Sequence, residues 1–225
     1  MVGLDKRYHA AGAAFLGVLL LLLAPGIAMA RQVHILAIGD SLMAGYGLME
    51  SDSPTGQLET LLKAKGHDVV IENAGVSGDT TRMGLDRIDW LLSGEKPDMA
   101  ILELGANDAL RGVPPEETRK NLTAMIEKLK AKGIPTLLAG MKAPRNMGKG
   151  YVAKFDPIYP ELAKKYDLVF YPFFMEDVID NPHLLQYDGR HPTYQGVKVI
   201  VDKMLPVVEP MVAELEKTPP PAGAD

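Results

Sequence analysis

The fold of this chain is decided by the stretch VHILAIGDSL, residues 33–42. Its first six residues form a short apolar run, which predicts a strand buried on both faces, as in a parallel sheet. Ser41 then falls where the strand ends and a loop or helix begins. In open α/β sheets, ligands bind at the carboxyl ends of the strands. Ser41 is therefore a candidate nucleophile, provided that the chain also supplies a base and an oxyanion site.

Five apolar, β-prone runs alternate with helical patterns along the chain. The strands are expected near residues 33–38, 69–72, 99–104, 135–139 and 168–171. Amphipathic patterns predict helices over residues 55–65, 81–92, 115–132, 152–165 and 194–215. This alternation predicts a three-layer α/β/α fold around a five-stranded parallel sheet, in the flavodoxin-like order 2-1-3-4-5. That order places Ser41 at the switch point of the sheet.

The N-terminal segment has the pattern of a secretory signal peptide. Lys6 and Arg7 precede a leucine-rich apolar stretch, Pro25 follows it, and an A-x-A motif ends at Ala30. We expect cleavage after Ala30, a periplasmic or secreted mature protein, and no stable membrane anchor after cleavage. The alternative is an uncleaved anchor, since the uncharged stretch is nearly long enough to span a bilayer.

Composition bounds the rest of the chain. Residues 31–216 suit one domain with its own core, which must hold without disulfides because the chain has no cysteine. A net charge of −5 without a basic stripe argues against a nucleic-acid partner. The Pro-rich tail, residues 217–225, is expected to be disordered. Nothing in the sequence indicates an oligomeric state.

One histidine is placed to act as a base. Of the four histidines beyond residue 30, three lie in a strand, after a helix or in a separate loop: His34, His67 and His183. His191 lies in the turn Asp188-Gly189-Arg190-His191-Pro192. An aspartate three residues earlier can accept from Nδ1–H and leave Nε2 free for the serine proton. The alternative is a capping aspartate beside an incidental histidine, which the presence of Ser41 makes less favourable.

Two further strand ends offer oxyanion donors. The loop at residues 73–81 contains glycines, which let a backbone N–H approach a ligand closely. The next strand is followed by residues 105–108, where the Asn107 amide is a further donor. Ordinary turn chemistry would account for either loop alone. Three consecutive strand ends at one crevice favour a functional site.

Three aspartates follow the same strand ends and raise the question of a metal site: Asp40, Asp79 and Asp108. Hard cations bind clusters of carboxylates. However, Asp40 and Asp79 lie at or near helix starts, where carboxylates accept from free backbone N–H groups. We therefore expect capping and loop bracing rather than a metal site.

A hydrophobic substrate pocket is expected around Ser41, because apolar residues stand at the tips of the surrounding loops. The candidates are Met43, Tyr46, Leu110, Met141, Pro144 and Phe173. The alternative is that some of them close the core.

The four motif blocks, residues 39–42, 73–81, 105–108 and 188–192, resemble in their order the SGNH (GDSL-type) hydrolase family. The similarity runs from about residue 33 to about residue 212, and it is nearest to the branch of bacterial arylesterases and periplasmic acyl thioesterase/lysophospholipases. The resemblance implies a nucleophile at Ser41, a base at His191 and an orienting carboxylate at Asp188. It implies an oxyanion hole from the Ser41 and Gly78 N–H groups and the Asn107 side chain. It also implies no metal or organic cofactor.

Two positions depart from that branch and bear on the substrate. Arg190 stands where an apolar residue is usual, and Met43 where a small hydroxyl residue is common. We expect an exported serine esterase that acts on short- to medium-chain acyl or aryl esters, with a small-molecule or lipid ester as partner. The alternatives are a lysophospholipase or acyl-CoA thioesterase for longer chains, a carbohydrate deacetylase, and a non-catalytic binding module.

Overall fold

The computed structural model describes residues 31–218. The expected signal peptide and residues 219–225 of the expected tail lie outside the described residues. Within residues 31–218, no helix combines the length and apolar composition needed to cross a bilayer.

The sheet has the predicted order, β2-β1-β3-β4-β5, and all its pairs are parallel. Its strands are β1 (Val33–Gly39), β2 (Val69–Gly75), β3 (Met99–Glu103), β4 (Thr136–Ala139) and β5 (Val169–Tyr171). All five residues of β3 and all four of β4 are buried. These continuous apolar runs form strands because helices cover both faces of the sheet.

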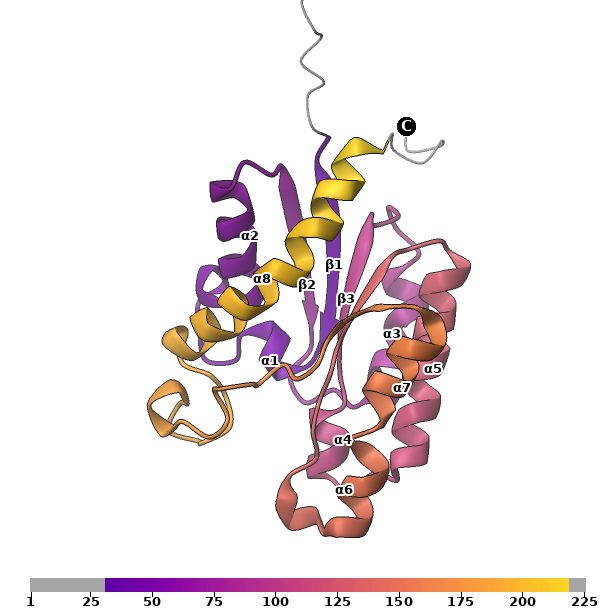
Figure 1. The fold of residues 1–225 in the computed structure, drawn as a ribbon, viewed down its shortest axis with the longest axis vertical. Helices are drawn as coiled ribbons and strands as arrows, with labels where there is room; N and C mark the ends of the chain where they lie inside the picture. The colour runs from indigo at the N-terminus through magenta and orange to yellow at the C-terminus, as the bar shows by residue number, and fades with distance from the viewer. Residues whose placement is uncertain (1–30, 219–225) are drawn as a thin grey trace, which may run out of the picture.

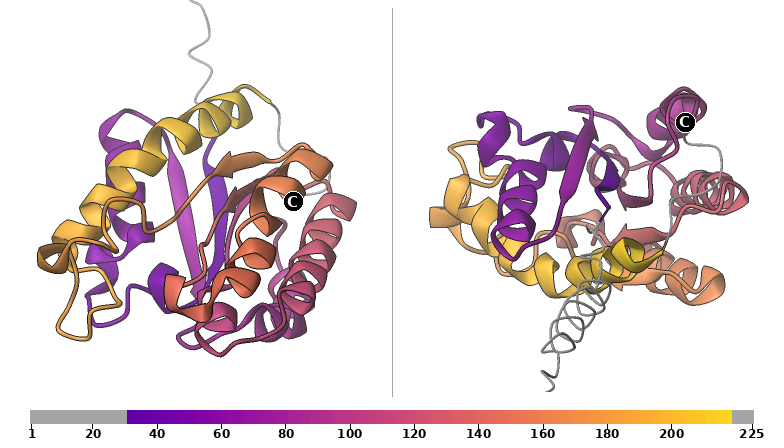
Figure 2. Two further views of the ribbon diagram at one scale, coloured as in Figure 1. Left: turned by 60° about the horizontal axis from the view of Figure 1, so that its bottom comes forward. Right: turned by 90° about the horizontal axis from the view of Figure 1, so that it is seen from above.

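Short and long helices connect the strands. They are α1 (Ser41–Ala44), α2 (Pro54–Ala64), α3 (Thr81–Leu91), α4 (Ala106–Leu110), α5 (Pro115–Ala131), α6 (Lys149–Phe155), α7 (Ile158–Tyr166) and α8 (Tyr194–Lys217). Three-residue 3₁₀ turns occur at Glu50–Asp52, Arg145–Met147 and Pro182–Leu184. Figures 1 and 2 show α2 and α8 together on one face of the sheet, and α3, α5 and α7 on the other. The three-layer prediction is confirmed.

The register of the strands brings their carboxyl ends to one edge. Gly39 at the end of β1 pairs with Gly75 at the end of β2, and Glu103 pairs with Ala139 across β3 and β4. The segments that follow β1, β2 and β3 therefore leave the sheet close together. This edge lies at the crevice where the strand order reverses, which is where α/β sheets bind ligands.

Two of the expected helices differ from the structure by more than one residue. The single helix expected over residues 152–165 is two helices, α6 and α7, separated at Asp156 and Pro157. Pro157 has no N–H to continue the helix, and the Asp156 side chain instead accepts from the Ala143 N–H at 2.9 Å. Helix α8 runs to Lys217, the first residue of the expected tail.

Candidate active site

Ser41 is the first residue of α1 and directly follows the strand β1. Asp40 caps this one-turn helix, since its Oδ1 accepts from the Leu42 N–H at 2.9 Å. Nε2 of His191, from the loop before α8, lies 2.8 Å from Ser41 Oγ. The two residues are 150 positions apart in the sequence. Their contact is the one expected of a nucleophile and its base.

Asp188 holds His191 from the other side of the ring. Its Oδ2 lies 2.5 Å from His191 Nδ1, while Oδ1 accepts from the backbone N–H groups of Arg190 and His191 at 2.9 and 3.0 Å. The hydrogen bond from the His191 side chain, followed by those two backbone groups, lowers the pKa of Asp188 to about 2. Gly189, at a φ of 66°, permits the tight turn. Asp188 is therefore ionised at neutral pH and fixes the orientation of the imidazole.

The His191 loop is tied to the loop after α1 by a residue that the sequence analysis does not single out. The Gln186 side-chain amide donates to the Tyr46 carbonyl at 2.7 Å and to the Pro192 carbonyl at 2.9 Å. The Tyr46 and His191 rings lie 4.5 Å apart between centroids. These contacts hold His191 over Ser41.

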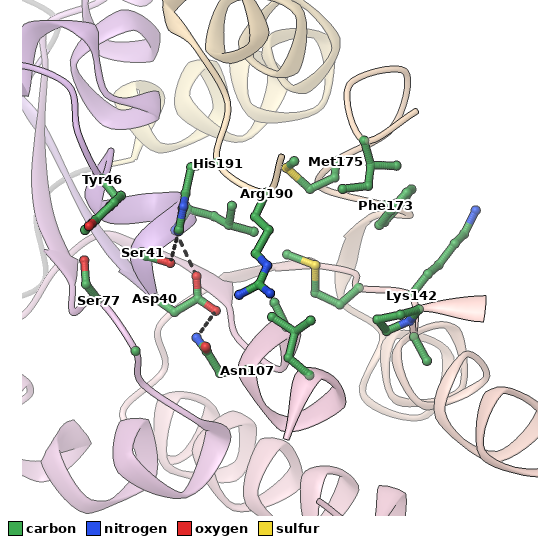
Figure 3. Close-up of a pocket in the computed structure, with 18 of the residues that line it drawn as sticks. Asp40, Ser41, Tyr46, Ser77, Asn107, Lys142, Phe173, Met175, Arg190 and His191 are labelled. Atoms are coloured by element: carbon green, nitrogen blue, oxygen red, sulfur yellow. Dashed lines mark hydrogen bonds between the residues drawn. The ribbon is translucent and has the colours of Figure 1, made fainter. Parts of the chain in front are cut away.

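The three expected oxyanion donors line the same cavity: Ser41, Gly78 and Asn107. Gly78 has a φ of 90°, and its carbonyl accepts from Arg111 Nη2 at 2.8 Å. Asn107 Nδ2 lies 3.1 Å from Asp40 Oδ2 and 3.0 Å from the Asp79 carbonyl. Figure 3 shows the Asn107 amide beside Asp40 and Ser41. The amide is thus held at the wall of the cavity by two acceptors.

The three aspartates at the strand ends brace the loops, as predicted. Asp40 caps α1, and Asp79 forms an ion pair with Arg87 at 2.7 Å. Asp108 accepts from the Thr81 N–H at 2.8 Å and so anchors the start of α3. In the part of the chain that the structure describes, no three His, Cys, Asp or Glu side chains cluster in a way that could hold a metal ion.

A second buried carboxyl lies under the Ser41 turn. Glu103 is fully buried, and its Oε2 accepts from the Asp40 N–H at 3.4 Å. Its Oε1 has no hydrogen-bond partner within residues 31–218. Burial, and then the nearby charge of Asp40, hold the pKa of Glu103 well above its ordinary range. Burial also raises the pKa of Asp40 to about 6, against the hydrogen bonds from Leu42 and Asn107.

A cavity of about 870 Å³ opens beside Ser41 and His191. Five of the six predicted pocket residues line it: Tyr46, Leu110, Met141, Pro144 and Phe173. Met43 does not, so this part of the prediction is wrong. Its side chain is 1% exposed, because that side of the single turn α1 faces the core. The Met43 side chain packs closely over Gly39, where any Cβ would overlap it.

The sequence matches a known protein family. The GDSL-like Lipase/Acylhydrolase family matches residues 37–199. The chain belongs to this family. Members of it are similar over most of this sequence. The "Arylesterase" of Vibrio mimicus is 42% identical over 158 residues, which cover 70% of this chain and 79% of that protein. The "Thioesterase 1/protease 1/lysophospholipase L1" of Escherichia coli (strain K12) is 38% identical over 178 residues, which cover 79% of this chain and 84% of that protein.

A solved structure of the same family extends this likeness to the fold. The crystal structure of AlinE4, an SGNH-hydrolase family esterase, is 50% identical, with a TM-score of 0.69. The match covers 80% of this chain and 96% of that one. This GDSL-like protein is therefore a serine hydrolase of ester bonds.

Other residues of this GDSL-like hydrolase line the cavity without having been predicted to do so. They come mainly from the loops after β4 and β5, and include Lys142, Arg145, Met175, Ile179 and Asp180. Arg190, which the sequence analysis names as a departure that bears on the substrate, also lines it. Their position after strand ends is the one signal in the sequence that could have found them.

Proposed function

We propose that the protein is an exported serine esterase that hydrolyses short- to medium-chain acyl or aryl esters through an acyl-enzyme on Ser41. The observation that carries the proposal is the chain of contacts from Asp188 through His191 to Ser41 Oγ, at the wall of a largely apolar cavity. That arrangement supplies a nucleophile, a base and an orienting carboxylate within hydrogen-bond reach.

In the acylation step, the Ser41 hydroxyl donates its proton to His191 Nε2 as Oγ attacks the ester carbonyl carbon. Asp188 accepts from Nδ1–H and stabilises the imidazolium that forms. The negative charge on the former carbonyl oxygen faces the Ser41 and Gly78 N–H groups and the Asn107 amide. The intermediate collapses as the bond to the leaving oxygen breaks, and His191 gives its proton to the departing alcohol or phenol.

The deacylation step repeats the same proton transfers with water. His191 removes a proton from the water as its oxygen attacks the acyl carbon. The bond to Ser41 Oγ then breaks, and Oγ takes the proton back from His191. The products are the carboxylic acid and the free enzyme, so no other reactant is consumed.

In this scheme the substrate oxygen shares the Asn107 amide hydrogens with two acceptors of the protein. Its Nδ2 already contacts Asp40 Oδ2 and the Asp79 carbonyl. These two acceptors fix the amide before substrate binds, which is the preorganisation that makes an oxyanion donor effective.

A longer-chain substrate is the second candidate. Away from Ser41 the cavity is lined by Phe173 and Met175 (Figure 3), and Met141 and Pro144 also belong to its lining. These apolar side chains suit an alkyl chain. The similarity to the lysophospholipase L1 of Escherichia coli supports the same alternative. A series of 4-nitrophenyl esters from acetate to palmitate, compared by kcat/KM, separates the two; a maximum at palmitate would favour the second.

The nucleophile is tested by labelling with a fluorophosphonate probe. We expect the wild type to be labelled and the Ser41→Ala variant to lose both labelling and ester turnover while its circular dichroism is unchanged. Ser93→Ala is the matched control, since its hydroxyl is exposed and donates to the Trp90 carbonyl, away from the cavity. Turnover retained in Ser41→Ala would refute the assignment.

Export is tested separately from catalysis. We propose cleavage after Ala30, on the pattern of charge, apolar stretch and small residues in the first 30 positions. N-terminal sequencing of the protein from the periplasm of an expressing bacterium should begin at Arg31. An uncleaved N-terminus in the membrane fraction would instead identify an anchor.

A further inference from the structure

Arg190 combines an unpaired charge with a position in the cavity. Its backbone N–H is bound by Asp188, but within residues 31–218 its guanidinium makes no ion pair or hydrogen bond. Figure 3 shows the side chain pointing into the cavity, with Ser41, His191 and Asn107 on one side and Phe173 and Lys142 on the other. The guanidinium therefore borders the part of the cavity next to Ser41.

Within residues 31–218, none of the other charged side chains that line the cavity forms an ion pair with Arg190. Arg145 is paired with Asp156 at 2.8 Å, and Asp40 is bonded to Leu42 and Asn107. Asp180 is the remaining carboxylate of the lining, and within the described residues it forms no ion pair.

Lys142 adds a second cation on the side of the cavity lined by Phe173 and Met175, which we call the apolar arm. Its Nζ lies 4.8 Å from the centroid of the Phe173 ring, and within the described part of the chain it has no carboxylate partner. Cations therefore exceed free carboxylates along this arm. Its walls include apolar side chains, while Arg190 and Lys142 are themselves exposed to solvent, so that salt screens their charges.

From this arrangement we propose that Arg190 selects esters that carry an anionic oxygen group, a carboxylate or a phosphate, on the part that lies along the apolar arm of the cavity. The inference rests on the proposed esterase function and adds the substrate class. Arginine suits this role because its planar fork of donors matches both groups with two parallel hydrogen bonds. Arg190 would then be a substrate-binding residue that takes no part in the proton transfers.

Two matched substrate pairs distinguish the two sources of the anion. The first pair is the 4-nitrophenyl monoester of adipic acid and its neutral methyl-capped form, which share the leaving group and the chain length. The second pair is a monoacylglycerol phosphate and the corresponding monoacylglycerol, with the anion on the alcohol part. For each pair the readout is the ratio of kcat/KM, anionic over neutral. A loss of kcat/KM that affects both members of a pair equally cancels in this ratio.

The proposal predicts a ratio above one for at least one pair in the wild type. In Arg190→Gln this ratio should fall about ten-fold, the lower range for a hydrogen bond to a charged group. Arg190→Lys should retain only part of it, because the charge remains but the paired donors of the guanidinium are lost. Raising the salt from about 0.01 M to about 0.5 M should reduce the wild-type ratio, as screening weakens partly exposed charge pairs. Arg119→Gln, which removes the same charge outside the cavity, is the control and should leave the ratio unchanged.

The same measurements separate failure of this inference from failure of the proposed function. A wild-type ratio of one or less for both pairs, or a ratio that Arg190→Gln does not lower, would overturn the inference and identify Arg190 as an ordinary solvated arginine. Turnover of both pairs would leave the esterase function intact in that case. If the wild type hydrolyses none of the four compounds, the proposed function fails, and this inference fails with it.

Discussion

The buried Asp40 carboxyl should make the protein less stable as the pH rises. Burial raises its pKa to about 6 in the folded protein, while an exposed aspartate has its model value of 3.8. Between these values the folded state binds more protons than the unfolded state. The stability that this group contributes is therefore complete below about pH 4 and lost as the pH rises through about 6. Asp40→Asn removes this dependence.

The magnitude follows from the size of the shift. Two pKa units correspond to about 3 kcal/mol, and about 2 kcal/mol of this should be lost between pH of about 4.5 and about 7.5. The asparagine oxygen still accepts from Leu42 N–H, but its amide faces the Asn107 amide, donor against donor. The loss of this hydrogen bond is the same at every pH. The test is therefore how the difference between the two free energies of unfolding changes with pH. Glu103, whose pKa burial also raises, is present in both proteins.

Urea unfolding of both proteins across this pH range measures the effect. The free energy of unfolding of Asp40→Asn, minus that of the wild type, should become more positive by about 2 kcal/mol from the acidic to the neutral end, because the wild type loses this stability. Asp188→Asn is the control, because the low pKa of Asp188, about 2, places its window below the range measured. A difference for Asp40→Asn that stays flat, or that falls with pH, would refute the assignment of a raised pKa to Asp40.

Three further predictions concern the oxyanion donor, the core and the turn after β3. Asn107→Ala should lower kcat for 4-nitrophenyl esters about 10²- to 10³-fold; an unchanged kcat removes Asn107 from the oxyanion hole. Met43→Ala should lower the free energy of unfolding by about 2–5 kcal/mol, as expected for a buried methionine, with the order of substrate chain lengths unchanged; a new order would return Met43 to the pocket. Gly105→Ala should lower thermal stability by more than about 2 kcal/mol, since its φ is 121° and its Cβ would overlap Tyr159 Oη; a wild-type melting temperature would refute this.

The sequence predicts the sheet order and the convergence of strand ends because both follow from regular physical rules. Continuous apolar runs alternating with amphipathic helices predict a parallel sheet, and parallel strands bring their ends to one edge. The contact between Ser41 and His191 has no local signal. It could be anticipated because a serine nucleophile requires a base and the chain offers few histidines.

What the sequence does not predict depends on side-chain direction and on long-range contacts. Met43 and Tyr46 are three residues apart, yet one is buried in the core and the other is 52% exposed at the cavity. Which side of a one-turn helix faces inward is decided by the β strands beneath it. The bridge from Gln186 to the Tyr46 carbonyl joins loops 140 residues apart, and glutamine in a loop carries no sign of such a partner.

The buried carboxyl groups of Asp40 and Glu103 link the stability of the protein to the geometry of the proposed site. Asp40 caps the helix that presents Ser41 and accepts from Asn107, and it does so from a buried position next to Glu103. Burial of both acids destabilises the protein at neutral pH, where the ordinary form of a carboxyl is charged. Relative to the wild type, Asp40→Asn should thus be more stable at neutral pH than at acidic pH. It should also have a lower kcat, because the new amide group no longer accepts from Asn107. Opposite signs in the two measurements would show that the function of the site, rather than its stability, requires the buried acid.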